Sequence, residues 1–79
     1  MKSVAVVFNE ELDPEERAEL RDRLLSIGSV IMIEPLHDTD LASVHLSYSV
    51  DLREDADAAA IAERIRKITG VKSAVVSAG

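Results

Sequence analysis

The stretch SVHLSYSVD, residues 43–51, alternates between polar and apolar side chains along its whole length. The apolar set is Val44, Leu46, Tyr48 and Val50, and the polar set is Ser43, His45, Ser47, Ser49 and Asp51. Successive side chains of a β-strand point to opposite faces of a sheet, so this alternation predicts a strand with one face in a core. The polar set is then left facing either water or a binding partner.

Three more segments have the composition of strands. The segment SVAVVFN, residues 3–9, alternates in the same way and is rich in β-branched residues. The segment VIMI, residues 30–33, is apolar on both faces, and a turn around residues 35–40 joins it to residues 43–51. The segment VKSAVVS, residues 71–77, is the last expected strand. The chain therefore supplies four strands for one sheet.

The first of two expected helices lies in residues 13–27. Asp13 is a good N-cap, Pro14 suits the first helical position and Glu16 completes a capping box. The residues of its apolar face, at helical spacing, are Leu20, Leu24 and Ile27. Gly28 then suits the end of this helix.

The second expected helix follows Asp55 or Asp57, either of which is a suitable N-cap. Its buried stripe is expected to be Ala58, Ile61, Ile65 and Ile68. Gly70 lies just beyond the stripe and suits the end of the helix.

The resulting element order is β-α-β-β-α-β, with connections of ordinary length. Two right-handed crossovers and one hairpin give the split βαβ, or ferredoxin-like, α+β sandwich. In this fold both helices cover one face of a four-stranded antiparallel sheet with the strand order 4-1-3-2. We expect residues 1–79 to form a single domain of this kind.

The composition narrows the classes of function. The 79 residues carry a net charge of −6 and no cysteine, which excludes disulfides and thiolate metal sites. Phosphate backbones are bound by Lys and Arg, so this charge argues against nucleic acid and anionic membranes as partners. No apolar run approaches the roughly 18 residues of a membrane span, and the N-terminus has no signal-peptide pattern. We therefore expect a cytoplasmic protein.

The helix-free face of the predicted sheet is the main candidate site. It carries small polar residues around an apolar strip, which suits close approach by a protein partner or a second copy of the chain. An ordinary, slightly apolar surface is the alternative. The candidate residues are Ala5, Val7, Ser43, His45, Ser47, Ser49 and Val75. The edge strands are expected to add Ser73 and either Ile31 with Ile33 or Val30 with Met32.

An acidic cluster at one end of the predicted fold is a second candidate site. The first loop and the hairpin meet there, and they supply Glu10, Glu11, Asp13, Asp38 and Asp40. These carboxylates suit a basic partner or a hard cation. A structural role accounts for the same residues, because acids complement the dipole of a first helical turn and Asp serves turns. We expect no metal, because HDTD, residues 37–40, lacks metal-ligand spacing.

No catalytic site is expected. His45 shares a strand face with Ser43 and Ser47, but a nucleophile also needs an orienting group, an oxyanion hole and a pocket. A flat sheet supplies none of these. The aromatic residues Phe8 and Tyr48 fall in the core-facing sets rather than on a base-stacking face. We therefore expect neither enzymatic activity nor a cofactor.

Two families resemble parts of the chain. VAVVFNEELDPEERAEL, residues 4–20, and GVKSAVV, residues 70–76, resemble subtilisin propeptides and the related free-standing protease inhibitors. That resemblance implies docking of the open sheet face on protease helices. LDPEERAELRDRLLSIGSVIMIEPL, residues 12–36, is similar to ACT regulatory domains and implies a homodimeric sensor of a small ligand. The expected function is a protein-binding module, acting as an inhibitor, antagonist or assembly element, with the ACT-type sensor as the alternative.

Overall fold

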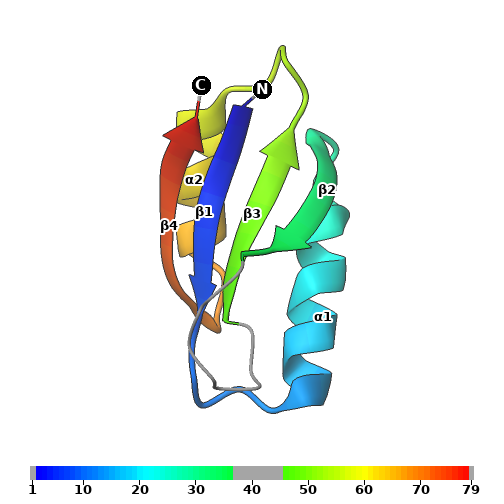
Figure 1. Ribbon diagram of the computed structural model, residues 1–79, viewed down its shortest axis with the longest axis vertical. Helices are drawn as coiled ribbons and strands as arrows, with labels where there is room; N and C mark the ends of the chain where they lie inside the picture. The colour runs from blue at the N-terminus through cyan, green and yellow to red at the C-terminus, as the bar shows by residue number, and fades with distance from the viewer. Residues whose placement is uncertain (1, 37–45, 79) are drawn as a thin grey trace.

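Four strands form one antiparallel sheet in the order β2-β3-β1-β4 in the computed structural model of the chain (Figure 1). The structure describes residues 2–36 and 46–78. The elements in chain order are β1 Lys2–Phe8, α1 Pro14–Leu25, β2 Val30–Pro35, β3 Ser47–Leu52, α2 Ala58–Arg66 and β4 Val71–Ala78. The predicted order 4-1-3-2 is the same order read from the opposite edge. The α+β class and the strand order are thus confirmed.

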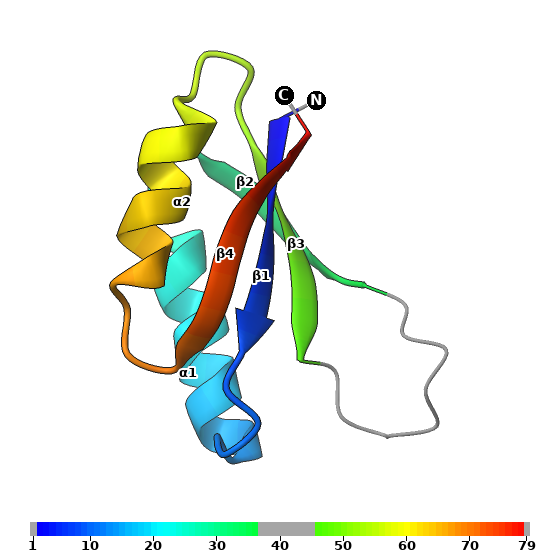
Figure 2. The same cartoon turned by 90° about the vertical axis from the view of Figure 1, so that its left-hand side faces the viewer.

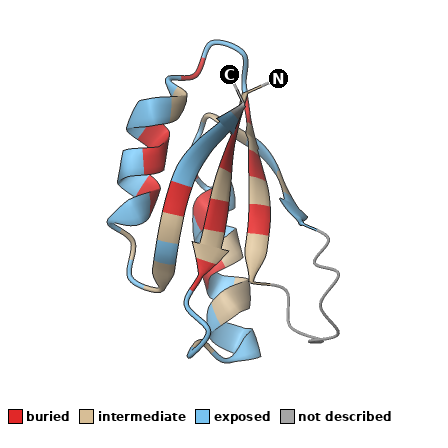
Figure 3. Cartoon of the chain, turned by 60° about the vertical axis from the view of Figure 1, so that its left-hand side comes forward, coloured by how far each residue is buried: buried red, intermediate tan, exposed pale blue. Residues whose placement is uncertain are grey.

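Both helices lie on the same side of the sheet (Figure 2). Helix α1 packs against β2, whereas α2 packs against β4 and β1. The core lies between the helices and the sheet, and buried positions alternate with less buried ones along β1 and β3 (Figure 3). The largest fully buried side chains are Phe8, Leu24, Leu52, Ile65, Val4, Val6 and Val50. Neither α1 nor α2, the helices of the described residues, is long and apolar enough to cross a membrane.

The alternation that predicts a strand in residues 43–51 is confirmed where the structure describes it. The core-facing residues of β3 are Tyr48, Val50 and Leu52, and all three are buried. Ser47, Ser49 and Asp51 are partly exposed between them. Leu46 precedes the strand and packs against the core from a partly buried position. Ser43, Val44 and His45 lie outside the described residues.

Tyr48 anchors β3 in the core while keeping its polar end satisfied. Its ring lies against the ring of Phe8, with centroids 4.7 Å apart and planes tilted by 32°. The Arg21 Nη1 donates a hydrogen bond to the Tyr48 hydroxyl at 3.2 Å, and the guanidinium lies 5.8 Å from the ring centroid. A buried tyrosine needs such a partner for its hydroxyl. The contact also ties α1 to the middle of the sheet.

Helix α1 begins as the sequence predicts. The Asp13 carboxylate accepts a hydrogen bond from the Glu16 N–H at 2.7 Å, and the Glu16 carboxylate accepts one from the Asp13 N–H at 3.0 Å. These reciprocal bonds form a capping box, with Pro14 at the first helical position. The expected stop is wrong by two residues. Ser26 is the C-cap and donates its N–H back into the last turn, so the helix ends before Gly28.

Helix α2 is capped by Asp57 rather than Asp55. The Asp57 carboxylate accepts a hydrogen bond from the Ala60 N–H at 3.2 Å. Beyond the helix, Gly70 has φ +100°, a backbone conformation that residues with a side chain rarely adopt. A Cβ there would lie 3.2 Å from the Leu12 Cδ1. The carbonyl of Gly70 accepts the Asn9 N–H at 2.8 Å, so this turn and the first loop meet at one end of the fold.

The edge strand β2 contains a β-bulge, and both predicted alternations for it are therefore wrong. Val30 pairs with Leu52 and Ile33 pairs with Val50, so both face the core. Met32 pairs with Asp51, and the register shifts between Val30 and Met32. A bulge places two residues of one strand opposite one residue of its neighbour, which interrupts the two-residue period. Ile31, the extra residue, and Met32 are both exposed.

Candidate functional site

The helix-free face is defined by the register of the four strands. Across the middle of the sheet, Glu34, Ser49, Ala5 and Val75 lie in one row, each opposite the next. Ser47, Val7 and Ser73 form a parallel row. The described residues of this face are Ser3, Ala5, Val7, Met32, Glu34, Ser47, Ser49, Asp51, Ser73, Val75 and Ser77. Five of the seven main candidate residues, namely Ala5, Val7, Ser47, Ser49 and Val75, thus share one surface, and so does the expected Ser73.

The largest apolar groups of the helix-free face lie toward its margins. Val75 on β4 is 62% exposed, and Met32 on β2 is 47% exposed. The bulged Ile31 beside Met32 is 58% exposed. Between these margins Ala5 and Val7 of β1 are only partly exposed. The sequence predicts an apolar strip that includes Val75, and the structure places Val75 and Met32 at opposite margins of the face.

Two pairs of side chains on this face are linked by hydrogen bonds. The Ser3 and Ser77 hydroxyls lie 2.7 Å apart and join β1 to β4. The Ser49 hydroxyl donates to the Asp51 carboxylate at 3.2 Å along β3. Side chains held in this way lose less conformational freedom when a partner covers them. The face is therefore a largely preformed surface.

The charge of the helix-free face lies at one corner. Glu34 pairs with Ser49, and Asp51 pairs with Met32, so both carboxylates lie on the β2–β3 side. Asp51 is expected from the sequence, whereas Glu34 is not. Its placement depends on the register of β2, which the apolar run VIMI leaves open. A partner that covers this corner needs cationic groups to match it.

The catalytic and metal-binding possibilities rest on few residues. Ser47 lies on the sheet face, and its potential partners Ser43 and His45 lie outside the described residues. Among residues 2–36 and 46–78, no group of three metal-ligating side chains comes together.

The acidic cluster predicted at one end of the fold is only partly described. Glu10, Glu11 and Asp13 lie in the connection between β1 and α1, and Asp38 and Asp40 lie outside the described residues. The Glu11 N–H donates to the Asn9 side-chain oxygen at 3.0 Å, and Asp13 caps α1. These bonds account for the loop conformation. The carboxylates of Glu10 and Glu11 belong to exposed residues.

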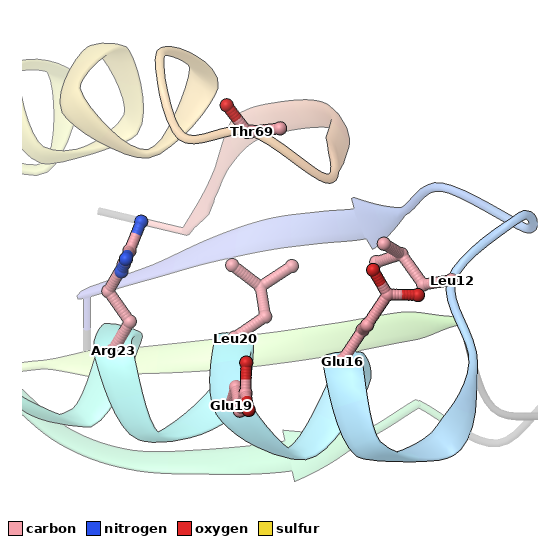
Figure 4. A pocket seen from close by; sticks show the side chains of 6 residues that line it. All are labelled: Leu12, Glu16, Glu19, Leu20, Arg23 and Thr69. Carbon is pink, nitrogen blue, oxygen red and sulfur yellow. The ribbon is translucent and has the colours of Figure 1, made fainter.

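A small pocket lies between α1 and the turn before β4 (Figure 4). Its volume is about 180 Å³, and its lining residues are Leu12, Glu16, Glu19, Leu20, Arg23 and Thr69. The lining combines two leucines with two carboxylates and one guanidinium. Drug-sized ligands occupy sites of roughly 300–1,000 Å³, so this pocket suits only a small molecule. The sequence gives no signal for it, because the turn and the helix meet only in the folded chain.

The surfaces described above are the basis for inferring a function. No protein-family model, no curated protein and no solved structure matches this chain.

Proposed function

We propose that the chain is a non-catalytic, ferredoxin-like module that docks on a protein partner through its helix-free face. The observation that carries this proposal is the exposure of Val75 and Met32 on either side of a surface of small residues. Extended apolar surface with a polar rim marks interaction sites, and the partly exposed Ala5 and Val7 lie between Val75 and the β2 margin of the face. Burying them on a partner removes apolar area from water and supplies the drive for association.

The centre of the helix-free face suits close approach. Ala5, Ser47 and Ser49 have short side chains, so a helix or sheet of the partner can approach the strands closely. The partly exposed Val7 adds apolar area at the same level. Small and partly ordered side chains also lose little conformational entropy on binding. The face therefore supports binding by shape as well as by apolar area.

The corner at Glu34 and Asp51 indicates the electrostatic character of the partner. Both carboxylates lie beside the exposed Met32, and the whole chain carries a net charge of −6. Complementary charge speeds association and rejects wrong partners. The partner surface is expected to place Lys or Arg opposite this corner. An inhibitory, antagonistic or assembly role is consistent with such docking, and the resemblance to protease-inhibiting propeptides involves the same face.

Arginine substitutions on the helix-free face test the proposal. Ala5→Arg and Ser47→Arg place a long charge at its centre, while Ala59→Arg adds the same charge on the exposed side of α2. Immobilised wild-type protein and Ala59→Arg are expected to capture the same protein from an extract of the source cells. The two sheet variants are expected to lose it, with urea midpoints close to that of the wild type. Equal capture by all four proteins would show that this face is not the docking surface.

The pocket beside α1 supports a second candidate function, an ACT-type sensor of a small ligand. Arg23 can pair with a ligand carboxylate, and Glu19 can pair with a ligand ammonium group, above the apolar Leu20. A free amino acid carries both groups. If the chain is a sensor, sedimentation should show a dimer, and an amino acid should raise its melting temperature. An Arg23→Gln variant should then lose the shift, and a monomer with no shift for any amino acid excludes the sensor.

A further inference from the structure

The direction of the backbone groups in the sheet follows from two hydrogen bonds at the end of β1. The Phe8 N–H donates to the Leu46 carbonyl on the β3 side, and the Asn9 N–H donates to the Gly70 carbonyl on the β4 side, each at 2.8 Å. Backbone groups of successive residues point to opposite sides of a strand. The backbone N–H and C=O groups of Ala5 and Val7 therefore point toward β4, where these residues pair with Val75 and Ser73.

The outer edge of β4 is consequently formed by the peptide groups of Ala74 and Val76. Ser73 and Val75 direct their N–H and C=O groups toward β1, so the two alternate residues direct theirs away from it. β4 is the last strand of the described sheet, as Figure 1 shows on its left. An unpaired strand edge of this kind is a template for another strand.

The opposite edge of the sheet, formed by β2, is less suited to pairing with another strand. The Leu36 N–H donates to the Ser47 carbonyl at 2.9 Å, so the backbone groups of Leu36 point toward β3. The backbone groups of the alternate residues Ile33 and Pro35 therefore point outward, away from β3. Proline has no N–H, which removes a donor from this edge. The bulge at Ile31 also interrupts its regular geometry. Proline and bulges are devices that protect sheet edges from pairing.

A groove follows the open edge. Its volume is about 470 Å³, and its lining residues are Arg66, Lys72, Ser73, Ala74, Val75 and Val76. Five of these are consecutive in β4, and successive side chains point to opposite faces, so the groove runs along the edge of the strand. Ala74 is 2% exposed and lies within the groove, whereas Val76 is 40% exposed.

The groove has the opposite charge to the chain as a whole. Arg66 and Lys72 are the charged residues of its lining, and both are cationic, although the chain has a net charge of −6. A partner strand that carries carboxylates complements them. A second copy of β4, whose sequence VKSAVVSA contains no Asp or Glu, would supply no carboxylate to match them. The charge therefore favours an acidic segment of another protein.

We infer that the open edge of β4 binds an extended, acidic peptide segment, which adds to the sheet as a fifth strand beside Ser73–Val76. The register of β4 against β1 shifts at both ends of this stretch, which limits the regular edge to these residues. Main-chain hydrogen bonds to Ala74 and Val76 supply affinity, and Arg66 and Lys72 select for carboxylates. This site adjoins the helix-free face and shares Ser73 and Val75 with it, but it uses the backbone edge of β4 and the cations Arg66 and Lys72, which the proposed docking through that face does not use.

A blocked synthetic peptide serves as the probe, with alternating valine and threonine residues between glutamates. Titration into isotope-labelled protein is expected to shift the amide resonances of Ala74 and Val76 and to slow their hydrogen exchange. The same peptide with lysines in place of the glutamates is expected to bind about tenfold more weakly. Absence of shifts at millimolar glutamate peptide, or equal binding of both peptides, would overturn the inference.

Variants separate the backbone contribution from the charge contribution. Val76→Pro removes an outward N–H without removing a bond to β1, and Val76→Ala keeps that N–H. The proline variant is expected to lose peptide binding and the alanine variant to keep it. Lys72→Glu is expected to weaken binding about tenfold, whereas Lys67→Glu, outside the groove, should have little effect. If Val76→Pro does not fold, the comparison of Lys72→Glu with Lys67→Glu still tests the inference. Equal peptide binding by these two variants overturns it.

Two further outcomes distinguish this site from other possibilities. Ser47→Arg is expected to leave peptide binding unchanged, so failure of docking through the helix-free face does not affect this result. Sedimentation of the peptide-free protein over a range of concentrations measures self-association. Self-association that Val76→Pro abolishes and Val76→Ala keeps would show that a second copy of the chain occupies the edge, and would overturn the inference.

Discussion

The two faces of the sheet use the same four strands for opposite purposes. Along β1, Val4, Val6 and Phe8 are fully buried under the helices, whereas Ala5 and Val7 between them are partly exposed. The helix-covered face holds the close-packed core, in which each lost methylene is felt. The helix-free face carries short side chains whose replacement leaves that core intact. Stability and the proposed recognition therefore depend on alternate residues of one strand, and each can change with little effect on the other.

The largest expected difference between the faces is at neighbouring residues of β1. Phe8→Ala removes a fully buried ring that lies against Tyr48, and it should cost about 3–5 kcal/mol of unfolding free energy. Val7→Ala removes two methyl groups from the partly exposed face and should cost less than half as much. Urea unfolding of both variants measures the difference. Similar losses would mean that the helix-free face also contributes a core.

A smaller difference is expected where β3 begins. Leu46 is partly buried and packs against the core, so Leu46→Ala should cost about 2 kcal/mol, the lower end of the range for buried leucines. Ser47→Ala lies on the helix-free face and should change stability by no more than about 0.5 kcal/mol. Thermal unfolding of the two variants provides the comparison. A costly Ser47→Ala would contradict the assignment of the two faces.

The smallest effect is expected for deletion of Ile31. Without this residue, Val30, Met32 and Ile33 are consecutive and already lie opposite Leu52, Asp51 and Val50. The deletion should produce a regular strand that keeps its core-facing residues, with a stability change within about 1 kcal/mol. Deletion of Ile33 is the control, because it removes a core-facing residue and leaves the bulge at Ile31 in place. Equal destabilisation by the two deletions in urea would show that Ile31 is not the extra residue.

The sequence predicts the fold where local chemistry and hydrophobic period agree. The capping box at Asp13 and Glu16 is a short-range signal, and it appears as expected. The alternation of β1 is nearly as clear, because the core-facing Val4 and Phe8 are each followed by a smaller or more polar residue. These features depend on neighbours in the chain, so a single sequence contains enough information to predict them.

The parts that sequence could not settle depend on pairing between distant segments. Residues 30–33 are all apolar, so nothing in their pattern shows that Ile31 is an extra residue or that Glu34 lies on the helix-free face. Likewise, only the register of the neighbouring strands shows that the backbone groups of Pro35 and Val76 point away from the sheet at its two edges. Asp55 and Asp57 are equivalent as caps by composition, and only the position of the first helical turn chooses between them.

The central position of β1 affects how the chain reaches its native state. Val4 lies opposite Val50 on one side and Val76 on the other, so the first strand gains its second neighbour only from the last one. Closing a loop of that length costs entropy before any contact repays it, and such topologies fold more slowly than helical bundles of similar size. During synthesis the apolar residues of β1 leave the ribosome long before β4 is made. Until β4 is available, the apolar residues of β1 lack one neighbouring strand and are expected to be covered only by transient contacts with earlier elements such as β3 and α1.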